Sequence, residues 1–196
     1  ISEGSPTAQL LTALEANEPS DVTALTRRAN LPDADALDLA RQAVAEGSAV
    51  ALGDGIEAGT QLYTLAGWTR LSGKAQQALA AYHEANPLRA GMTREELRSR
   101  LTVTGNLATQ VVNHLSGSGV IVDEGGVLRL PEHAVAVSGE QQAQMDAYVA
   151  QLAADPFPGE SSKIGANLLA LLVEQGRVVR ATDGVVFDAA TWERLS

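Results

Sequence analysis

Cysteine is absent from this chain of 196 residues, which excludes disulfides, thiolate zinc sites and cysteine nucleophiles and favours the cytoplasm. No stretch of about 18 residues is continuously apolar, so the sequence predicts no membrane span. No signal peptide is recognisable, and the chain starts with Ile1 rather than Met. We therefore expect a fragment or a processed chain.

Aromatic and basic side chains are also scarce. Aromatics make up 4% of the residues against 45% hydrophobic, so small globular cores must rest on Leu, Val and Ala. There are 14 Lys and Arg against 24 Asp and Glu, a net charge of −10. Residues 1–66 carry −7, residues 67–136 carry +1 and residues 137–196 carry −4. Because phosphate contacts need basic groups, only the middle segment remains a candidate for nucleic-acid binding.

The usual signs of catalysis are weak. The nearest phosphate-loop match ends at Gly73-Lys74, but its spacing has one residue too many, and Ala75 replaces the Ser or Thr that would bind magnesium. Glu95 and Glu96 are adjacent on a predicted helix, so they point apart and suit capping or solvation better than paired acid–base work. We expect no enzymatic activity in this fragment.

The histidines give no metal motif either. His83, His114 and His133 stand alone, without a second ligand at metal-binding spacing. His114 falls on a predicted helix, where a role at the edge of the core is favoured over that of a catalytic base. We expect no cofactor and no metal in this fragment.

One pattern occurs three times. An apolar helix end is followed by a glycine, a short β-branched run and a glycine-containing turn, which are typical of a helix stop, a strand and a hairpin. The copies run from Ala43 to Gly55, from Asn113 to Gly126 and from Leu171 to Gly184. Such a series forms the last helix and the wing of a winged helix-turn-helix.

The three copies are unevenly spaced, which argues against a solenoid. Gly47, Gly119 and Gly176 lie 72 and 57 residues apart. We therefore predict a mainly α fold with small β-hairpins (α+β), built as three tandem winged helix-turn-helix domains. The expected boundaries are 1–66, 67–136 and 137–196.

The first module reads as three helices and a hairpin. Pro6 opens the first helix, Ser20 or Asp21 caps the second, and Asp33 or Asp35 caps the third. The hairpin is expected from Val50–Leu52 to a return strand near Gln61–Tyr63.

The second module begins with a longer helix from Trp68 to Asn86, which also connects it to the first. Thr93 and Glu96 form a capping box for a short helix that ends near Leu101. The third helix is expected over Thr104–Leu115, and the wing over Ile121–Leu130.

The third module follows a linker at Pro131–Ser138 and starts with a helix over Gln141–Ala153. Its second helix is missing from the pattern, so we expect either that a stretch near Glu160–Lys163 is absent from the sequence or that this helix has collapsed to a turn. Val185–Phe187 closes the wing, and Trp192 lies in a short tail helix.

A more specific segment starts at Tyr82-His83, continues through Asn86-Pro87-Leu88-Arg89 and Gly91-Met92, and ends in Glu95–Leu101. It resembles, nearly residue by residue, the entry to the second of four C-terminal winged helices in SelB, the bacterial selenocysteine-specific elongation factor. Gly176–Arg180 and Val185–Phe187 also resemble that family. The likeness is strong over residues 74–130 and weak over the first module.

The resemblance implies a parent factor with a GTPase and tRNA-binding body that uses GTP and Mg. Four winged helices follow, and the last grips an mRNA hairpin beside a UGA codon. The chain has no GTPase motif and stops after the third module, so we expect a spacer arm between the body and the mRNA anchor. The implied partners of the parent are selenocysteyl-tRNA, the mRNA hairpin and the ribosome, whereas the fragment itself should be a cytoplasmic monomer that binds RNA weakly.

Four arginines of the second module are candidates for contact with RNA or the ribosome: Arg89, Arg94, Arg98 and Arg100. Arg94 and Arg98 share one helix face because they are four residues apart. The competing interpretation is a solvated helix that Glu95 and Glu96 partly neutralise.

Two other classes stay open. A DNA-binding regulator of tandem winged helices would need basic third helices, yet Asp33–Ala45 has only Arg41 and Thr104–Leu115 has neither Lys nor Arg. An acidic protein-interaction scaffold, similar to the chromosome-segregation protein ScpB, shares the charge and the fold but does not explain the segment from Asn86 to Leu101.

Overall fold

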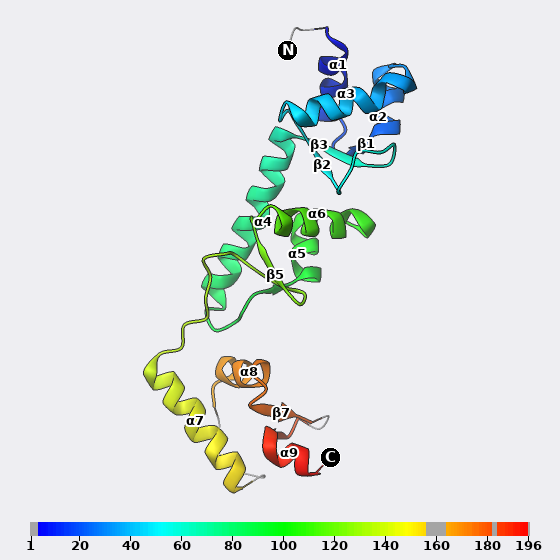
Figure 1. Ribbon diagram of the computed structural model, residues 1–196. Helices are drawn as coiled ribbons and strands as arrows, with labels where there is room; N and C mark the ends of the chain where they lie inside the picture. The colour runs from blue at the N-terminus through cyan, green and yellow to red at the C-terminus, as the bar shows by residue number, and fades with distance from the viewer. Residues whose placement is uncertain (1–3, 156–163, 182–183, 196) are drawn as a thin grey trace. The chain divides into compact units, whose positions relative to one another are not determined.

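The computed structural model describes residues 4–155, 164–181 and 184–195 of the chain (Figure 1). Helices and small antiparallel sheets form three helix-and-hairpin groups, which confirms the winged-helix α+β fold. The chain divides into two compact units, residues 1–81 with 92–131 and residues 82–91 with 132–196. The domain boundaries expected from the sequence stay predictions.

The first winged helix contains α1 (Pro6–Glu15), α2 (Val22–Ala29) and α3 (Asp33–Ala45). Its sheet has the order β1-β3-β2, formed by β1 (Ser20–Asp21), β3 (Gln61–Thr64) and β2 (Ala49–Leu52). Leucines of α1 and α2 pack against alanines of α3, whose small side chains let the helices approach closely. The buried cluster comprises Leu14, Val22, Leu25, Ala36, Ala40, Ala43, Ala49 and Leu62.

The first two helices of this module have side-chain caps, of which only the cap by Asp21 was expected from the sequence. Ser5 Oγ accepts the Ala8 N–H at 3.1 Å, and Asp21 Oδ1 accepts the Ala24 N–H at 2.7 Å. The expected aspartate cap of α3 is wrong, because Pro32 occupies the cap position and offers no side-chain acceptor. Asp35 lies inside the first turn instead, where its charge complements the helix dipole.

The second winged helix contains α4 (Leu65–Ala85), α5 (Arg94–Leu101) and α6 (Gly105–Gly117). Its sheet has the order β4-β6-β5, formed by β4 (Met92–Thr93), β6 (Val127–Arg129) and β5 (Val122–Glu124). The core takes apolar side chains from all three helices and from the sheet. They include Ala75, Leu79, Met92, Leu97, Leu101, Val111, Val112, Leu115, Ile121 and Leu128.

A partly buried carboxylate holds the start of α4. Glu18 accepts hydrogen bonds from Thr64 N at 2.9 Å and Thr64 Oγ1 at 2.7 Å, and it pairs with Arg70 at 2.5 Å. Thr64 Oγ1 in turn accepts the Gly67 N–H at 3.0 Å, as a helix cap does. The turn after α1 thereby fixes the direction in which α4 leaves the first sheet.

The third winged helix contains α7 (Gly139–Ala154), α8 (Ala166–Glu174), the hairpin strands β7 (Val178–Arg180) and β8 (Val186–Asp188), and α9 (Ala189–Leu195). Ser138 and Gln141 form a capping box, so α7 starts two residues before the predicted Gln141. The question of a missing or collapsed second helix lies outside the described residues.

The three repeated glycines close three equivalent helices. Gly47, Gly119 and Gly176 have φ of 71°, 75° and 66°, in the left-handed region. The residue after each glycine donates its N–H to a carbonyl five residues earlier: Ser48 to Ala43, Val120 to Leu115 and Arg177 to Leu172, at 2.9, 3.0 and 2.9 Å. These bonds define a Schellman stop, and the helix ends predicted near the three glycines are confirmed.

Within the described residues, no helix combines the length and the apolar character that a membrane crossing requires.

Candidate nucleic-acid interface

The candidate interface is the outward surface of the second winged helix, which α5, α6 and the hairpin form. It holds three of the four predicted arginines. The capping box predicted at the start of α5 is present. Thr93 N donates to Glu96 Oε2 at 3.0 Å, and Glu96 N donates to Thr93 Oγ1 at 3.2 Å. Thr93 also pairs with Val127 in the sheet. The sheet therefore fixes where α5 begins.

Arg94 is anchored to the wing. Its guanidinium forms an ion pair with Asp123, whose side chain is only 10% exposed. Asp123 Oδ1 also accepts the Gly126 N–H at 2.9 Å. Gly125 and Gly126 have φ of 63° and 94°, as a two-residue hairpin turn requires. Arg94 thus fixes α5 to the hairpin turn, which reduces the charge it can offer to phosphate.

The other arginines differ from one another. Arg98 lies 3.3 Å from Glu95 on the same helix, in an exposed pair of the kind that contributes little to stability. Arg100 is exposed and forms no ion pair within the described part of the chain. Arg89 belongs to the other compact unit and pairs with Glu174. The structure therefore brings Arg94, Arg98 and Arg100 together on α5 and assigns Arg89 to a different set of contacts.

The outward face of α6 is polar but uncharged. Asn106, Thr109 and Asn113 are exposed on it, and Gln110 is half-buried. Asn113 and Ser116 line a cavity of about 660 Å³ together with groups from α5 and the wing, namely Arg94, Asp123, Gly125 and Gly126. Amide and hydroxyl groups can recognise base edges by hydrogen bonds, but they supply none of the phosphate attraction that dominates affinity.

The first winged helix covers part of α6. Strand β2 lies against α6, and the turn residues Gly53 and Asp54 line a cavity of about 380 Å³ with Gln110 and His114. Burial lowers the pKa of His114, so this side chain is held neutral at physiological pH. Sequence reasoning missed Asp54 and Asp123 as neighbours of this surface, since neither residue lies on the helices that carry the arginines.

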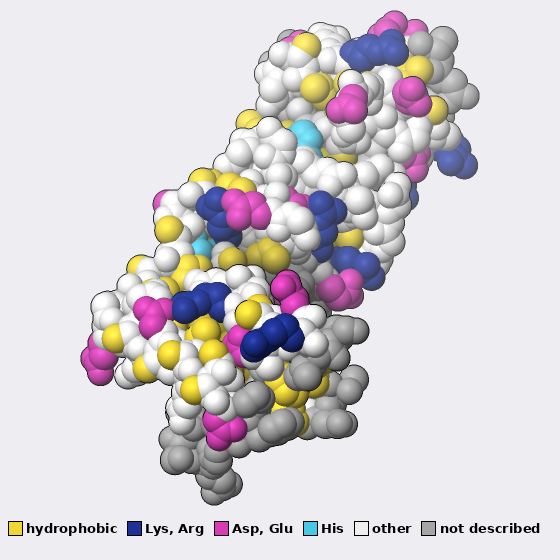
Figure 2. Space-filling model, turned by 60° about the horizontal axis from the view of Figure 1, so that its bottom comes forward, with side chains coloured by type: hydrophobic (Ala, Val, Ile, Leu, Met, Phe, Trp, Pro, Cys, Tyr) yellow, Lys and Arg dark blue, Asp and Glu magenta, His cyan; other side chains and the backbone are white. Residues whose placement is uncertain are grey.

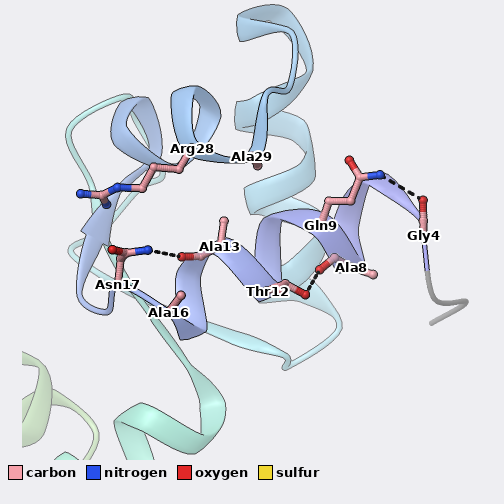
Figure 3. Close-up of a pocket in the computed structure, with 9 residues that line it drawn as sticks. All are labelled: Gly4, Ala8, Gln9, Thr12, Ala13, Ala16, Asn17, Arg28 and Ala29. Carbon is pink, nitrogen blue, oxygen red and sulfur yellow. Dashed lines mark hydrogen bonds between the residues drawn. The ribbon is translucent and has the colours of Figure 1, made fainter.

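A cavity of about 760 Å³ lies beside α1 of the first winged helix (Figure 3). It is lined by residues of α1 and of the segments at its two ends, and by Arg28 and Ala29 of α2. Polar groups that line it have partners: Thr12 Oγ1 donates to Ala8 O at 2.9 Å, Asn17 Nδ2 donates to Ala13 O at 3.2 Å, and Arg28 Nη1 donates to Ser20 Oγ at 2.8 Å. No catalytic pair is arranged among the residues that line it.

Charge is mixed on one face of the chain. On the face shown in Figure 2, basic and acidic side chains of the described residues stand close to one another, without a broad basic area. Within the described ranges, no group of three or more His, Asp or Glu gathers as a metal site would require. The surface therefore favours hydrogen bonding and weak electrostatic contact over tight phosphate binding.

Residues 76–130 match the model of the family described as "Elongation factor SelB, winged helix", for its second winged helix. The "Selenocysteine-specific elongation factor" of Desulfomicrobium baculatum is 28% identical over 138 residues, which are 64% of this chain and 22% of that protein. The chain thus spans about a fifth of that relative. The mRNA-binding domain of elongation factor SelB from E. coli, solved in complex with SECIS RNA, has the same fold, with a TM-score of 0.51, 18% identity and coverage of 66% of this chain and 98% of that one.

Proposed function

We propose that this chain, which carries a winged-helix region similar to that of the selenocysteine-specific elongation factors of the SelB family, is the spacer arm of such a factor. The arm would link the GTPase and tRNA-binding body to a module that binds the mRNA hairpin, during selenocysteine incorporation at UGA. Selenocysteyl-tRNA, the mRNA hairpin and the ribosome are the proposed partners of the whole factor. The proposed role needs no catalytic step within these residues.

The observation that carries this proposal is the packing of α6. In a DNA-reading winged helix, the corresponding helix is free to enter the major groove. Here β2 lies against α6, and α6 (Gly105–Gly117) contains no Lys or Arg. Long helix α4 starts at the first sheet, where Glu18 and Thr64 cap it, and continues into the second winged helix. Because α4 is capped at the first winged helix and packs into the second, it can hold the two modules apart, which supports the proposed spacer role.

A first experiment tests RNA binding by the chain itself. The 196-residue chain should bind a selenocysteine-insertion hairpin weakly at physiological salt and should not prefer it to an unrelated hairpin of equal length. The E. coli domain with the same fold was solved in complex with SECIS RNA. If this chain bound the hairpin as tightly as an RNA-binding domain does, that result would speak against the spacer role. Tight and selective binding in a gel-shift assay would contradict the spacer role.

A second experiment tests spacing in the intact factor. A flexible Gly-Ser insertion after Ser72 interrupts α4, whereas the same insertion after Gly59 lengthens the exposed loop of the first wing. We expect the first insertion to lower UGA readthrough on a reporter and the second to leave readthrough near the wild-type level. GTP hydrolysis and hairpin affinity should stay unchanged in both factors. Equal readthrough from the two factors would count against a spacer arm.

Direct RNA contact by α5 is the second candidate, because Arg100 is exposed and Arg94 and Arg98 share its helix. Such contact would be electrostatic and steeply dependent on salt. We expect the Arg94→Ala/Arg98→Ala double variant of the intact factor to lose ribosome or RNA association and to show a flatter salt dependence if this candidate holds. Unchanged association and readthrough would leave α5 as a solvated helix.

A further inference from the structure

In sequence, residues 82–91 form the end of α4 and the loop that leads to β4 of the second winged helix, but they group with the unit that contains the third. Leu88 is 7% exposed and belongs to an apolar cluster of the third winged helix. The other buried members come from α7, α8 and β7, and they are Met145, Leu152, Leu168, Leu171, Leu172 and Val178. Leu88 is therefore a core residue of the third winged helix.

Polar contacts reinforce this placement. The Arg89 guanidinium forms an ion pair with Glu174, the last residue of α8. The Arg89 carbonyl oxygen lies 3.0 Å from Nε2 of His133, in the segment that leads to α7. The His83 ring stacks on the His133 ring, with centroids 3.5 Å apart and an angle of 11° between the planes. The two chain segments that join the modules thus contact each other beside the third winged helix.

The third winged helix also uses other side chains from outside its own helices. Val135 and Val137 of the preceding segment pack against the same cluster as Leu88. In the described part of the chain, its sheet has only the strands β7 and β8, whereas each of the other two sheets has a third short strand. A small core with a two-stranded sheet buries little apolar surface, so each added apolar side chain has a large relative effect.

We infer that residues 82–91 form a built-in docking segment for an interaction surface on α7 and α8. Leu88 fills the apolar part of that surface, and Arg89 meets the carboxylate at the end of α8. The occupant is this chain's own Leu-Arg pair, which lies within the most family-specific part of the sequence. Leu88 and Arg89 therefore serve the third winged helix, where Arg89 makes an intramolecular ion pair, and the RNA contact of Arg89 stays a prediction. This inference does not depend on the spacer role.

Met92 offers a matched control for Leu88. It lies four residues further along the chain and is 0% exposed, and it pairs with Leu128 in the sheet of the second winged helix. Truncation of either side chain to alanine removes a comparable apolar volume from a core. The two variants should therefore loosen different parts of one chain.

Hydrogen exchange on the full chain tests the assignment. Leu88→Ala should speed amide exchange in α7 and α8 by at least about tenfold and leave α1–α3 and α6 unchanged, since local opening reports local stability. Met92→Ala should speed exchange in α5 and α6 and leave α7 and α8 unchanged. If Leu88→Ala alters α7 and α8 no more than Met92→Ala does, the docking segment is refuted.

A charge exchange keeps the test decisive if Leu88→Ala fails to fold. Arg89→Glu and Glu174→Arg should each speed exchange at the end of α8 about two- to threefold, the size expected for a partly exposed ion pair. The double variant should restore the wild-type rate. Failure of that restoration would overturn the inference. A fall in RNA association for Arg89→Ala with unchanged exchange would return Arg89 to RNA binding and overturn its docking role.

Discussion

The imidazole of His114 stands edge-on to the indole of Trp68, with ring centroids 4.8 Å apart and an angle of 84° between the ring planes. Trp68 lies in the first turns of α4 and meets Tyr63 of β3 at 5.7 Å. Three rings therefore connect the first sheet to α6. Edge-to-face contact of this kind adds to the stability that burial provides.

The first prediction concerns pH. Burial lowers the pKa of His114 in the folded chain, so the unfolded chain binds more protons near and below its ordinary pKa of about 6.5. The stabilisation by the neutral side chain is complete above the ordinary pKa of histidine, and it is lost as the pH falls through the lower pKa that His114 has in the folded chain. We expect a higher melting temperature at pH 8 than at pH 5.5, and a smaller difference in His114→Gln. An identical pH difference in both proteins would contradict a partly buried His114 that stays neutral.

The second prediction compares two glycines of α4. A Cβ at Gly67 would lie 2.1 Å from the Glu18 carboxylate oxygens, whereas a Cβ at Gly73 would meet open space. Gly67→Ala should cost about 1–3 kcal/mol because it overpacks the cap of α4. Gly73→Ala should stabilise the chain by about 0.5–1 kcal/mol through helix propensity. Denaturant unfolding of the two variants measures both values, and equal effects would argue against the tight Glu18 contact.

The third prediction concerns the helix stops. Gly47, Gly119 and Gly176 have positive φ, and a Cβ at each would meet no atom within 4 Å. Alanine at each site should therefore cost about 1 kcal/mol through backbone strain alone. d-Alanine at the same sites, introduced by chemical ligation, should be tolerated because its preferred φ is positive. If l- and d-alanine prove equally harmful, the cost has another origin.

The fourth prediction separates Asp123 from its partner on α5. Asp123 accepts the Gly126 N–H and also pairs with Arg94, while Arg94 is 47% exposed. Arg94→Ala should cost no more than about 1 kcal/mol. Asp123→Ala should cost about 1–3 kcal/mol, since it leaves a half-buried N–H without its acceptor. Arg100→Ala is the control and should leave the free energy of unfolding unchanged. A larger loss for Arg94→Ala than for Asp123→Ala would contradict this order.

The local features of the fold could be predicted from the sequence. The glycine stops, the capping box at Thr93 and the hairpin turn at Gly125-Gly126 each depend on residues close together in the chain. Strands β1 and β4 were missed because each has two residues, too few to show an alternating pattern. The aspartate cap of α3 was wrong because a proline took the cap position.

The tertiary contacts that set the partners of the candidate-site arginines could not be predicted from the sequence. Glu18 and Arg70 are 52 residues apart, and Arg89 and Glu174 are 85 residues apart. Sequence spacing identifies neighbours on one helix, but it does not identify pairs that meet through tertiary packing. The four arginines therefore looked like one basic group, whereas Arg89 and Arg94 each have an acidic partner from another element.

The position of Leu88 also bears on how such arms can recombine. A crossover at the sequence boundary near residue 137 would join a third winged helix to a docking segment from a different parent. Because Leu88 and Arg89 lie between α4 and α5 of the second winged helix, no single crossover can exchange the third module together with its docking segment and leave the whole second module unchanged. Chimeras that transplant residues 82–91 along with residues 132–196 should retain the core, and homologous arms are expected to be inherited as blocks that include both modules.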